Sequence, residues 1–193
     1  MRHELEVAQE VARQAGAVLR ERFGGALQIS YKGPTNIVTD ADWRSETLIR
    51  SLLGRAFPEY GFLGEEGGEM SPPRVRRETG APRWLVDPLD GTTNFAHGYP
   101  WFCISIGLEE DGTATLGAVY NPILDEMYSA ERGGGAWCNG RRLRVSETAT
   151  LRDSLIASGF PYDTKRAGDN SRAWQRGLKQ TRALRCDGSA ALD

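Results

Sequence analysis

The stretch that decides the fold is Trp84-Leu85-Val86-Asp87-Pro88-Leu89-Asp90-Gly91-Thr92-Thr93-Asn94-Phe95. Its first residues, together with Arg83, form a short run with β propensity that predicts a strand. The strand is expected to end in a polar turn, in which Pro88 fixes one backbone angle and Gly91 permits close approach of another group. If a helix begins after this glycine, its free backbone N–H groups form a seat for an anion. The stretch therefore predicts a strand, a turn and a helix start that together can hold a ligand.

The predicted turn carries two carboxylates. Asp87, Asp90 and the carbonyl oxygen of Leu89 can converge on adjacent cations because the proline and the glycine bend the chain around them. Mg2+ favours octahedral oxygen coordination and is usually held by one or two carboxylates together with a substrate phosphate. Taken alone, Asp, Pro, Gly and Thr also favour a simple capped turn. The combination indicates a two-metal site beside an anion seat.

Upstream of this stretch, a second acidic pair, Glu65-Glu66, follows the strand-like run Phe62-Leu63-Gly64. Its carboxylates are further hard oxygen ligands at the end of a strand. The segment from Gly67 to Pro82 contains tandem prolines, several arginines and several glycines, which is typical of a surface loop. We expect this segment to be a mobile flap rather than a domain linker.

Two helices are predicted at the N-terminal end. Apolar residues recur every three or four positions from Leu5 to Phe23, and the pair Gly24-Gly25 ends this helix. A second helix begins with a capping-box-like start at residues 39–42 and continues to Phe57, before Pro58 stops it. The chain therefore begins with a helix, a loop and a second helix.

Downstream of the decisive stretch, short strands follow one another through tight turns at Asp111-Gly112 and Asn139-Gly140. The predicted strands cover residues 102–109, 113–120, 126–129, 136–138 and 143–145. They form an antiparallel meander, and a further strand at residues 154–158 with a helix at 167–181 starts a second module. Helices that precede several adjacent strands indicate a layered α+β protein. We expect a first domain at residues 1–150 and the beginning of a second at 151–193.

Composition excludes several classes of function. The 193 residues are 39% hydrophobic and 26% charged with a formal charge of -2, so the chain has no basic footprint for nucleic acid or an anionic membrane. The three cysteines, Cys103, Cys138 and Cys186, are too scattered for a disulfide framework or a zinc site. Only two histidines occur, which excludes a three-histidine metal site. Neither a signal peptide nor an apolar run of about 18 residues is present, so a cytoplasmic protein with a small polar ligand is expected.

The stretch from Trp84 to Phe95 resembles the signature of the inositol monophosphatase family. Three other segments match in the same order: Asn36–Asp42 resembles the entry to the second helix, Gly64–Glu66 an upstream metal-ligand motif, and Gly188–Ala191 a substrate-side motif. The resemblance runs from the first helix to the last residue. It implies a Mg2+-dependent phosphomonoesterase, usually a homodimer, that acts on a small phosphorylated substrate. The implied architecture is a layered α/β/α/β/α sugar-phosphatase fold with a largely antiparallel first sheet.

The resemblance also implies a role for each matching residue. The metal ligands are Glu66, Asp87, Asp90 and the Leu89 carbonyl. Glu65 and Asp42 support the metal-bound water, and Thr92 orients the attacking water. The residues that contact the phosphate and the rest of the substrate are Gly91, Thr92, Asp90, Gly188, Ser189 and Ala190, and Lys32 matches a basic residue on a mobile loop.

The sequence ends at Leu192-Asp193, just inside the last matching motif. Family members continue with a Trp-Asp motif whose aspartate completes the second metal site, and with much of the second sheet. We therefore expect the second metal site and the second α/β module to be incomplete within these residues. One alternative is a catalytically impaired family member that acts as a regulatory or interaction module. Within the enzymes, histidinol phosphate, fructose 1,6-bisphosphate and nucleotide phosphates are alternatives to myo-inositol 1-phosphate.

Overall fold

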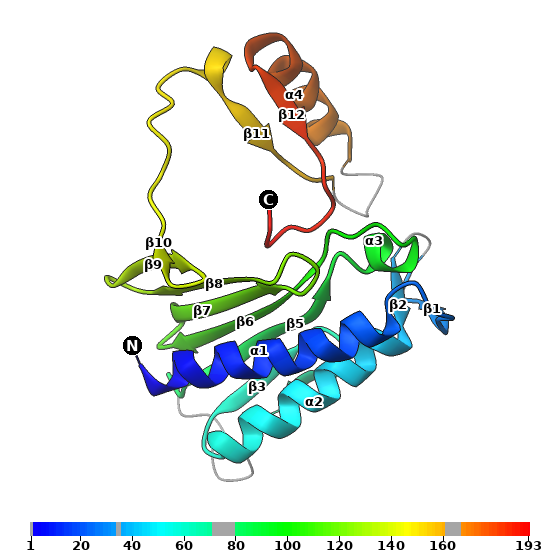
Figure 1. Cartoon of the computed structure of the whole chain (residues 1–193), viewed down its shortest axis with the longest axis vertical. Helices are drawn as coiled ribbons and strands as arrows, with labels where there is room; N and C mark the ends of the chain where they lie inside the picture. The colour runs from blue at the N-terminus through cyan, green and yellow to red at the C-terminus, as the bar shows by residue number, and fades with distance from the viewer. Residues whose placement is uncertain (1, 34–35, 71–79, 161–166) are drawn as a thin grey trace.

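The structure is a computed structural model that describes residues 2–33, 36–70, 80–160 and 167–193. Within these residues an eight-stranded sheet has the strand order β10-β9-β8-β7-β6-β5-β3-β4 (Figure 1). Its strands are β3 (Gly61–Gly64), β4 (Gly68–Met70), β5 (Arg83–Asp90), β6 (Cys103–Glu110), β7 (Thr113–Asn121), β8 (Glu126–Glu131), β9 (Gly135–Cys138) and β10 (Arg141–Arg142). Only the β3–β5 pairing in this sheet is parallel, which confirms the predicted, largely antiparallel first sheet.

Two helices cover one face of the sheet, α1 (His3–Arg22) and α2 (Asp40–Ala56) (Figure 1). The apolar stripe of α1 packs against β6 and β7, and α2 packs against α1 and β5. The aromatic side chain of Trp84 and the aliphatic side chains of Ile104 and Ile106 fill the layer between sheet and helices. Burying this apolar surface is the main force that holds helices and sheet together. The α+β class predicted from the sequence is confirmed.

The remaining elements lie around this body. A short antiparallel hairpin, β1 (Ile29–Tyr31) and β2 (Ile37–Thr39), precedes α2, and α3 (Thr92–Ala96) follows β5. The C-terminal elements are η1 (Leu151–Asp153), β11 (Leu155–Ala157), α4 (Ala167–Gln180) and β12 (Ala183–Arg185). The parallel pair β11–β12 and α4 form a small module above the large sheet (Figure 1). The predicted strand at 154–158 and helix at 167–181 are confirmed, and the domain boundary at residue 150 stays a prediction.

Three sequence predictions differ from the structure. The polar turn expected at residues 87–90 is part of β5, which continues to Asp90 with a shift in its register against β6. The predicted strand at 143–145 does not form. Its place beside β9 is taken by β10 at Arg141–Arg142, the Leu143 amide makes a last hydrogen bond to the Ala136 carbonyl oxygen, and the Val145 side chain beyond it is 95% exposed. The predicted flap at 67–82 begins with β4, which pairs with β3 through a tight turn. Residues 71–79 of that segment lie outside the described residues. No helix of the described chain is long and apolar enough to span a bilayer.

Candidate functional site

The predicted site residues come together where β3 and β5 end. These strands are parallel neighbours, so their C-terminal ends lie at the same edge of the sheet. The Glu65 amide donates a hydrogen bond to the Val86 carbonyl oxygen at 3.1 Å, which holds the two acidic turns side by side. The β5–β6 register shifts between Asp87 and Asp90, on either side of Pro88, which has no amide hydrogen to donate to the ladder. The acidic turns therefore converge for a topological reason.

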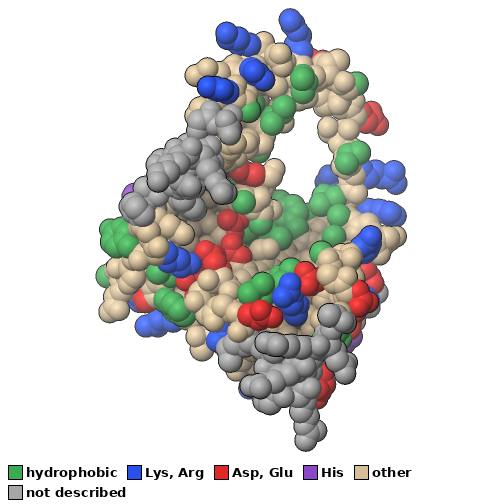
Figure 2. Space-filling view, turned by 180° about the vertical axis from the view of Figure 1, so that it is seen from behind, with side chains coloured by type: hydrophobic (Ala, Val, Ile, Leu, Met, Phe, Trp, Pro, Cys, Tyr) green, Lys and Arg blue, Asp and Glu red, His purple; other side chains and the backbone are tan. Residues whose placement is uncertain are grey.

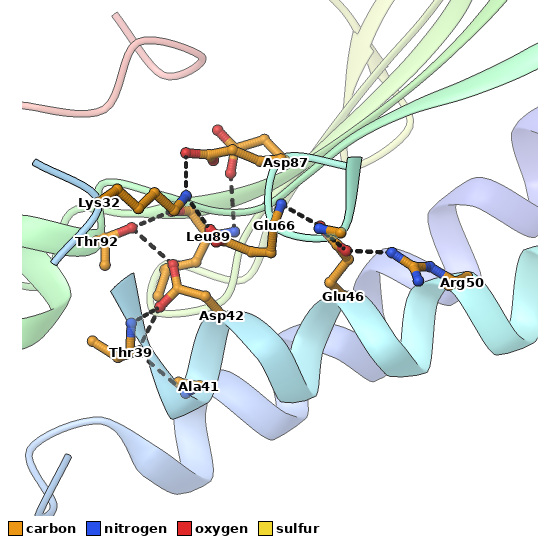
Figure 3. A network of polar contacts seen from close by, with 12 residues as sticks. Lys32, Thr39, Ala41, Asp42, Glu46, Arg50, Glu66, Asp87, Leu89 and Thr92 are labelled. Atoms are coloured by element: carbon orange, nitrogen blue, oxygen red, sulfur yellow. Dashed lines mark hydrogen bonds and ion pairs between the residues drawn. The ribbon is translucent and has the colours of Figure 1, made fainter. Parts of the chain in front are cut away.

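Glu66 lies at the centre of this cluster and its side chain is only 1% exposed. Its Oε1 accepts a hydrogen bond from the Lys32 ammonium at 2.6 Å, and Lys32 also contacts Glu65 Oε1 at 3.0 Å (Figure 3). Burial raises the pKa of Glu66, although the Lys32 ammonium opposes this shift. The second oxygen, Oε2, is buried and has no hydrogen-bond partner among the described residues. A buried carboxylate oxygen without a donor is a suitable ligand for a hard cation.

Asp87 is the most strongly perturbed carboxyl group of the cluster. Burial, together with the charges of Glu65 and Asp90, raises its pKa to about 8. Its Oδ1 accepts a hydrogen bond from the Leu89 amide at 3.1 Å. Closely spaced acidic groups of this kind disfavour full ionisation unless a positive charge is added. The cluster therefore has the charge and the oxygen donors that suit a divalent cation.

Thr92 and Asp42 form a hydrogen-bonded pair next to the acidic turns (Figure 3). The Thr92 hydroxyl lies 2.9 Å from Asp42 Oδ1 and 3.0 Å from the Leu89 carbonyl oxygen, and its single hydrogen can be donated to either. Asp42 Oδ2 accepts hydrogen bonds from the amide and the hydroxyl of Thr39, in the capping box that begins α2. Burial raises the pKa of Asp42 even though these donors oppose the shift. The capping box thus fixes the orientation of the carboxylate that holds Thr92.

Asp90 binds the C-terminal motif. Its Oδ2 accepts hydrogen bonds from the Ser189 hydroxyl and the Ala191 amide, both at 2.7 Å, and its Oδ1 accepts one from the Ala190 amide at 3.2 Å. Figure 2 shows acidic side chains gathered beside the hollow between the sheet and the C-terminal module. A cavity of about 400 Å3 adjoins them, lined by Asp90, Thr93, Asn94, Ser158, Gly159, Phe160, Cys186, Gly188, Ser189, Ala190 and Asp193. The motif at 188–190 therefore lies beside Asp90, while its contact with a substrate stays a prediction.

The predicted helix start after Gly91 is present as α3. Gly91 adopts a φ of 96°, and a Cβ atom at this position would lie 3.1 Å from the Trp101 carbonyl oxygen. Glycine is needed here because a side chain would meet both an unfavourable backbone angle and the segment Trp101-Phe102 that leads into β6. Downstream, the Asn94 amide nitrogen donates to the carbonyl oxygens of Trp101 and Asp187, each at 2.7 Å. Whether the backbone amides at residues 91 and 92 bind phosphate stays a prediction.

The carboxylates do not form a ready ligand set. Among the described residues, no group of three or more His, Cys, Asp and Glu side chains is arranged to hold a metal ion. Several of their oxygens are engaged instead by the Lys32 ammonium, the Leu89 amide and the segment 189–191. The structure thus brings the predicted residues together, while their assignment as ligands stays a prediction.

Sequence reasoning missed three residues that contact the site. Ser45 and Glu46 are buried polar residues of α2 that bind the two acidic turns. They precede Ile49 by four and three residues, so they extend the apolar stripe of the helix toward its start. Cys103 is buried with its sulfur 3.6 Å from Asp90 Oδ2. Its thiol pKa is raised mainly by burial and, to a smaller extent, by the negative charge of Asp90. For Ser45 and Glu46, the sequence did contain a signal, because each is a polar residue in the apolar stripe of a predicted helix.

Comparison with known proteins gives a consistent result. The sequence model of the inositol monophosphatase family matches residues 1–193. An inositol-1-monophosphatase of Rhizobium meliloti (strain 1021) is 49% identical over 160 residues, which cover 82% of this chain and 58% of that protein. An inositol-1-monophosphatase of Mesorhizobium japonicum is 44% identical over 98% of this chain and 70% of that protein. The crystal structure of the extragenic suppressor protein suhB from Bartonella henselae superposes with a TM-score of 0.92 at 40% identity, over 100% of this chain and 73% of that one. The chain thus spans 58% of the length of the first of these curated relatives and 70% of the second.

Proposed function

Because the chain belongs to the inositol monophosphatase family, we propose that it is a Mg2+-dependent phosphomonoesterase that hydrolyses a small phosphorylated alcohol such as myo-inositol 1-phosphate. The observation that carries the proposal is the convergence of Glu66, Asp87 and the Thr92–Asp42 pair at the ends of β3 and β5. We further propose a cytoplasmic homodimer that has neither a nucleic acid nor a membrane as partner. The small formal charge of -2 supports the last two exclusions.

The residues that would hold Mg2+ are Glu66, Asp87, Asp90 and the Leu89 carbonyl. The buried, unpartnered Oε2 of Glu66 and the raised pKa of Asp87 support this assignment, since both groups gain from a nearby cation. When bound, Mg2+ would neutralise phosphoryl charge and lower the pKa of water. Lys32, which already pairs with Glu65 and Glu66, would add positive charge on the substrate side.

The Thr92–Asp42 pair would orient the attacking water. While the Thr92 hydroxyl donates its hydrogen to Asp42, its oxygen remains able to accept a hydrogen bond from water. The raised pKa of Asp42 makes its carboxylate a stronger proton acceptor than an ordinary aspartate, and Glu65 would assist it. The amides of Gly91 and Thr92 would hold the phosphate at the start of α3. Asp90, Gly188, Ser189 and Ala190 would contact the rest of the substrate beside the cavity of about 400 Å3, a volume that suits a small molecule.

The test is phosphate release by the purified protein, with and without Mg2+, from four esters. These are myo-inositol 1-phosphate, histidinol phosphate, fructose 1,6-bisphosphate and 3'-phosphoadenosine 5'-phosphate. We expect Mg2+-dependent turnover of myo-inositol 1-phosphate and its loss in Asp90→Asn. Undiminished turnover by that variant would contradict the two-metal assignment, and preference for another ester would change the substrate.

A second candidate is a regulatory or interaction module without catalysis, and it is favoured by the name of a relative in Xylella fastidiosa, Nus factor SuhB, which is 35% identical over 98% of this chain. If this candidate is right, the wild type shows no heat of Mg2+ binding that disappears in the Asp87→Ala variant. If the enzyme proposal is right, the wild type shows such a heat and Asp87→Ala removes it. Calorimetry with Mg2+ alone therefore separates the two functions, because it does not depend on choosing the right ester.

A further inference from the structure

One face of α2 carries three buried polar residues, Asp42, Ser45 and Glu46, followed by the apolar Ile49 and Leu53. The spacing of three and four residues places all five on the side of the helix that packs against the sheet. Glutamate is rarely buried unless its charge is paired. Glu46 is only 1% exposed, so its environment requires an explanation.

The Glu46 carboxylate binds the turn that carries Glu66 (Figure 3). Its Oε2 accepts a hydrogen bond from the Glu66 amide, and its Oε1 accepts one from the Gly67 amide, both at 2.8 Å. Arg50, one turn further along α2, donates to Oε1 at 2.6 Å. One carboxylate therefore fixes two successive amides of the acidic turn, and the arginine balances its charge.

The packing around these hydrogen bonds leaves no space for a Cβ atom at Gly64 or Gly67. A Cβ atom on Gly64 would lie 2.5 Å from Glu46 Oε2, and one on Gly67 would lie 2.7 Å from Oε1 and 2.0 Å from the Arg50 guanidinium. Both glycines are thus needed for the backbone to approach the carboxylate this closely. The turn is held by hydrogen bonds and by close contact together.

Ser45 holds the other acidic turn in the same way. Its hydroxyl is fully buried and donates to the carbonyl oxygen of Pro88 at 2.8 Å, between Asp87 and Asp90 in the sequence. Asp42, one turn earlier, holds Thr92. Three consecutive polar positions on one helix face therefore each contact a different part of the site.

We infer that Glu46 is a positioning residue of the cation site, an inference that rests on the proposed function. Both of its carboxylate oxygens are engaged by the amides of residues 66 and 67 and by Arg50, so we assign it a role through Glu66 and not on the substrate. By fixing the amides of residues 66 and 67, it sets the direction in which the Glu66 side chain leaves the backbone. That direction places the unpartnered Oε2 of Glu66 inside the acidic cluster. Groups that orient a metal ligand in this manner commonly change metal affinity when they are replaced.

The experiment measures the affinity of the full chain for Mg2+ alone, by calorimetry, in the wild type and in Glu46→Gln. The glutamine keeps the size of the side chain, but its NH2 group faces an amide that also donates. We expect Mg2+ affinity to fall by about 10-fold to 100-fold. Saturating Mg2+ should then restore most of the kcat, which a general loss of folded protein would not allow. In the metal-free variant, the amide proton resonances of Glu66 and Gly67 should shift because they lose a charged acceptor.

The matched control is Glu4→Gln, which removes a paired carboxylate on α1, bound by Arg2 and Tyr60 away from the acidic turns. Its Mg2+ affinity should equal that of the wild type. Unchanged Mg2+ affinity in a folded Glu46→Gln protein would overturn the inference. If that variant does not fold, Glu46→Asp keeps the charge but is too short to reach both amides, and wild-type affinity in this protein would overturn the inference equally. A wild type without Mg2+ binding would contradict the proposed function itself, and the inference with it.

Discussion

At the scale of single residues, the hydroxyl of Thr92 can be removed while the shape of the side chain is kept. It lies between Asp42 Oδ1 and the Leu89 carbonyl oxygen, at 2.9 and 3.0 Å. Thr92→Val keeps the shape of the side chain but removes the hydrogen-bonding group. Because an oriented water then loses its acceptor, we expect kcat at saturating Mg2+ to fall by about 100-fold or more. Initial rates of phosphate release measure this.

The matched variant is Thr92→Ser, which retains the hydroxyl and should keep most of the activity. The valine variant leaves Asp42 Oδ1 without this donor, which we expect to cost about 1 kcal/mol of folding free energy. A Thr92→Val protein with the wild-type rate would show that the hydroxyl does not act on the water.

At the scale of elements, the start of α3 depends on Gly91 for two separate reasons, its φ of 96° and its approach to the Trp101 carbonyl oxygen. We expect Gly91→Ala to lower the free energy of unfolding by about 1–3 kcal/mol, measured by urea denaturation. Gly98→Ala is the control, because Gly98 also has a positive φ, 70°, but open space around its Cβ position. It should cost about 1 kcal/mol or less. Equal losses in both variants would contradict the role of the close approach.

The same element shows how far the sequence could predict this structure. The strand and the helix start at residues 84–95 depend on local signals, namely a β-rich run, a proline and a glycine, and they were predicted correctly. The turn expected at Asp87–Asp90 was wrong, because the strand continues through a register shift to Asp90. The acidic pairs could also be placed together, since each follows a strand. Local patterns do not report which partner a side chain meets, and for this reason the buried role of Glu46 was missed. Its partners are the amides of a turn 20 and 21 residues further along the chain.

Long-range contacts explain the remaining differences. The strand predicted at 143–145 has suitable residues, but its place beside β9 is taken by β10 and its Val145 stays exposed. The contact between Lys32 and Glu66 joins residues 34 apart, and no local pattern predicts it. The resemblance to a family placed Lys32 near the site, whereas the residues alone did not. Ligand roles for the acidic residues stay predictions because they depend on a cation and a substrate.

At the scale of the whole molecule, Arg2 joins the first helix to the β6–β7 hairpin. Its guanidinium binds Glu110 at 2.7 Å and Glu4 at 3.2 Å; the Thr115 hydroxyl also donates to Glu110, and the Tyr60 hydroxyl to Glu4. The hydrogen bonds from Arg2 hold the pKa of both glutamates below the ordinary value of 4.5. The folded protein therefore releases these protons at a lower pH than the unfolded chain does.

The sign of the pH dependence follows from these lowered pKa values. Above pH 4.5 both glutamates are ionised in the folded and the unfolded state, so the full stabilisation is present. As the pH falls through the lowered folded-state values, the carboxylates take up protons, the ion pairs weaken and the stabilisation is lost. Because the three side chains are partly exposed, we expect the whole cluster to contribute about 1 kcal/mol.

Replacing Arg2 with methionine should lower the free energy of unfolding by about 1 kcal/mol near pH 7 and by much less near about pH 3. Urea denaturation of both proteins across this range measures the difference, and a deficit that stays constant with pH would assign the effect of Arg2 to packing rather than to its charge.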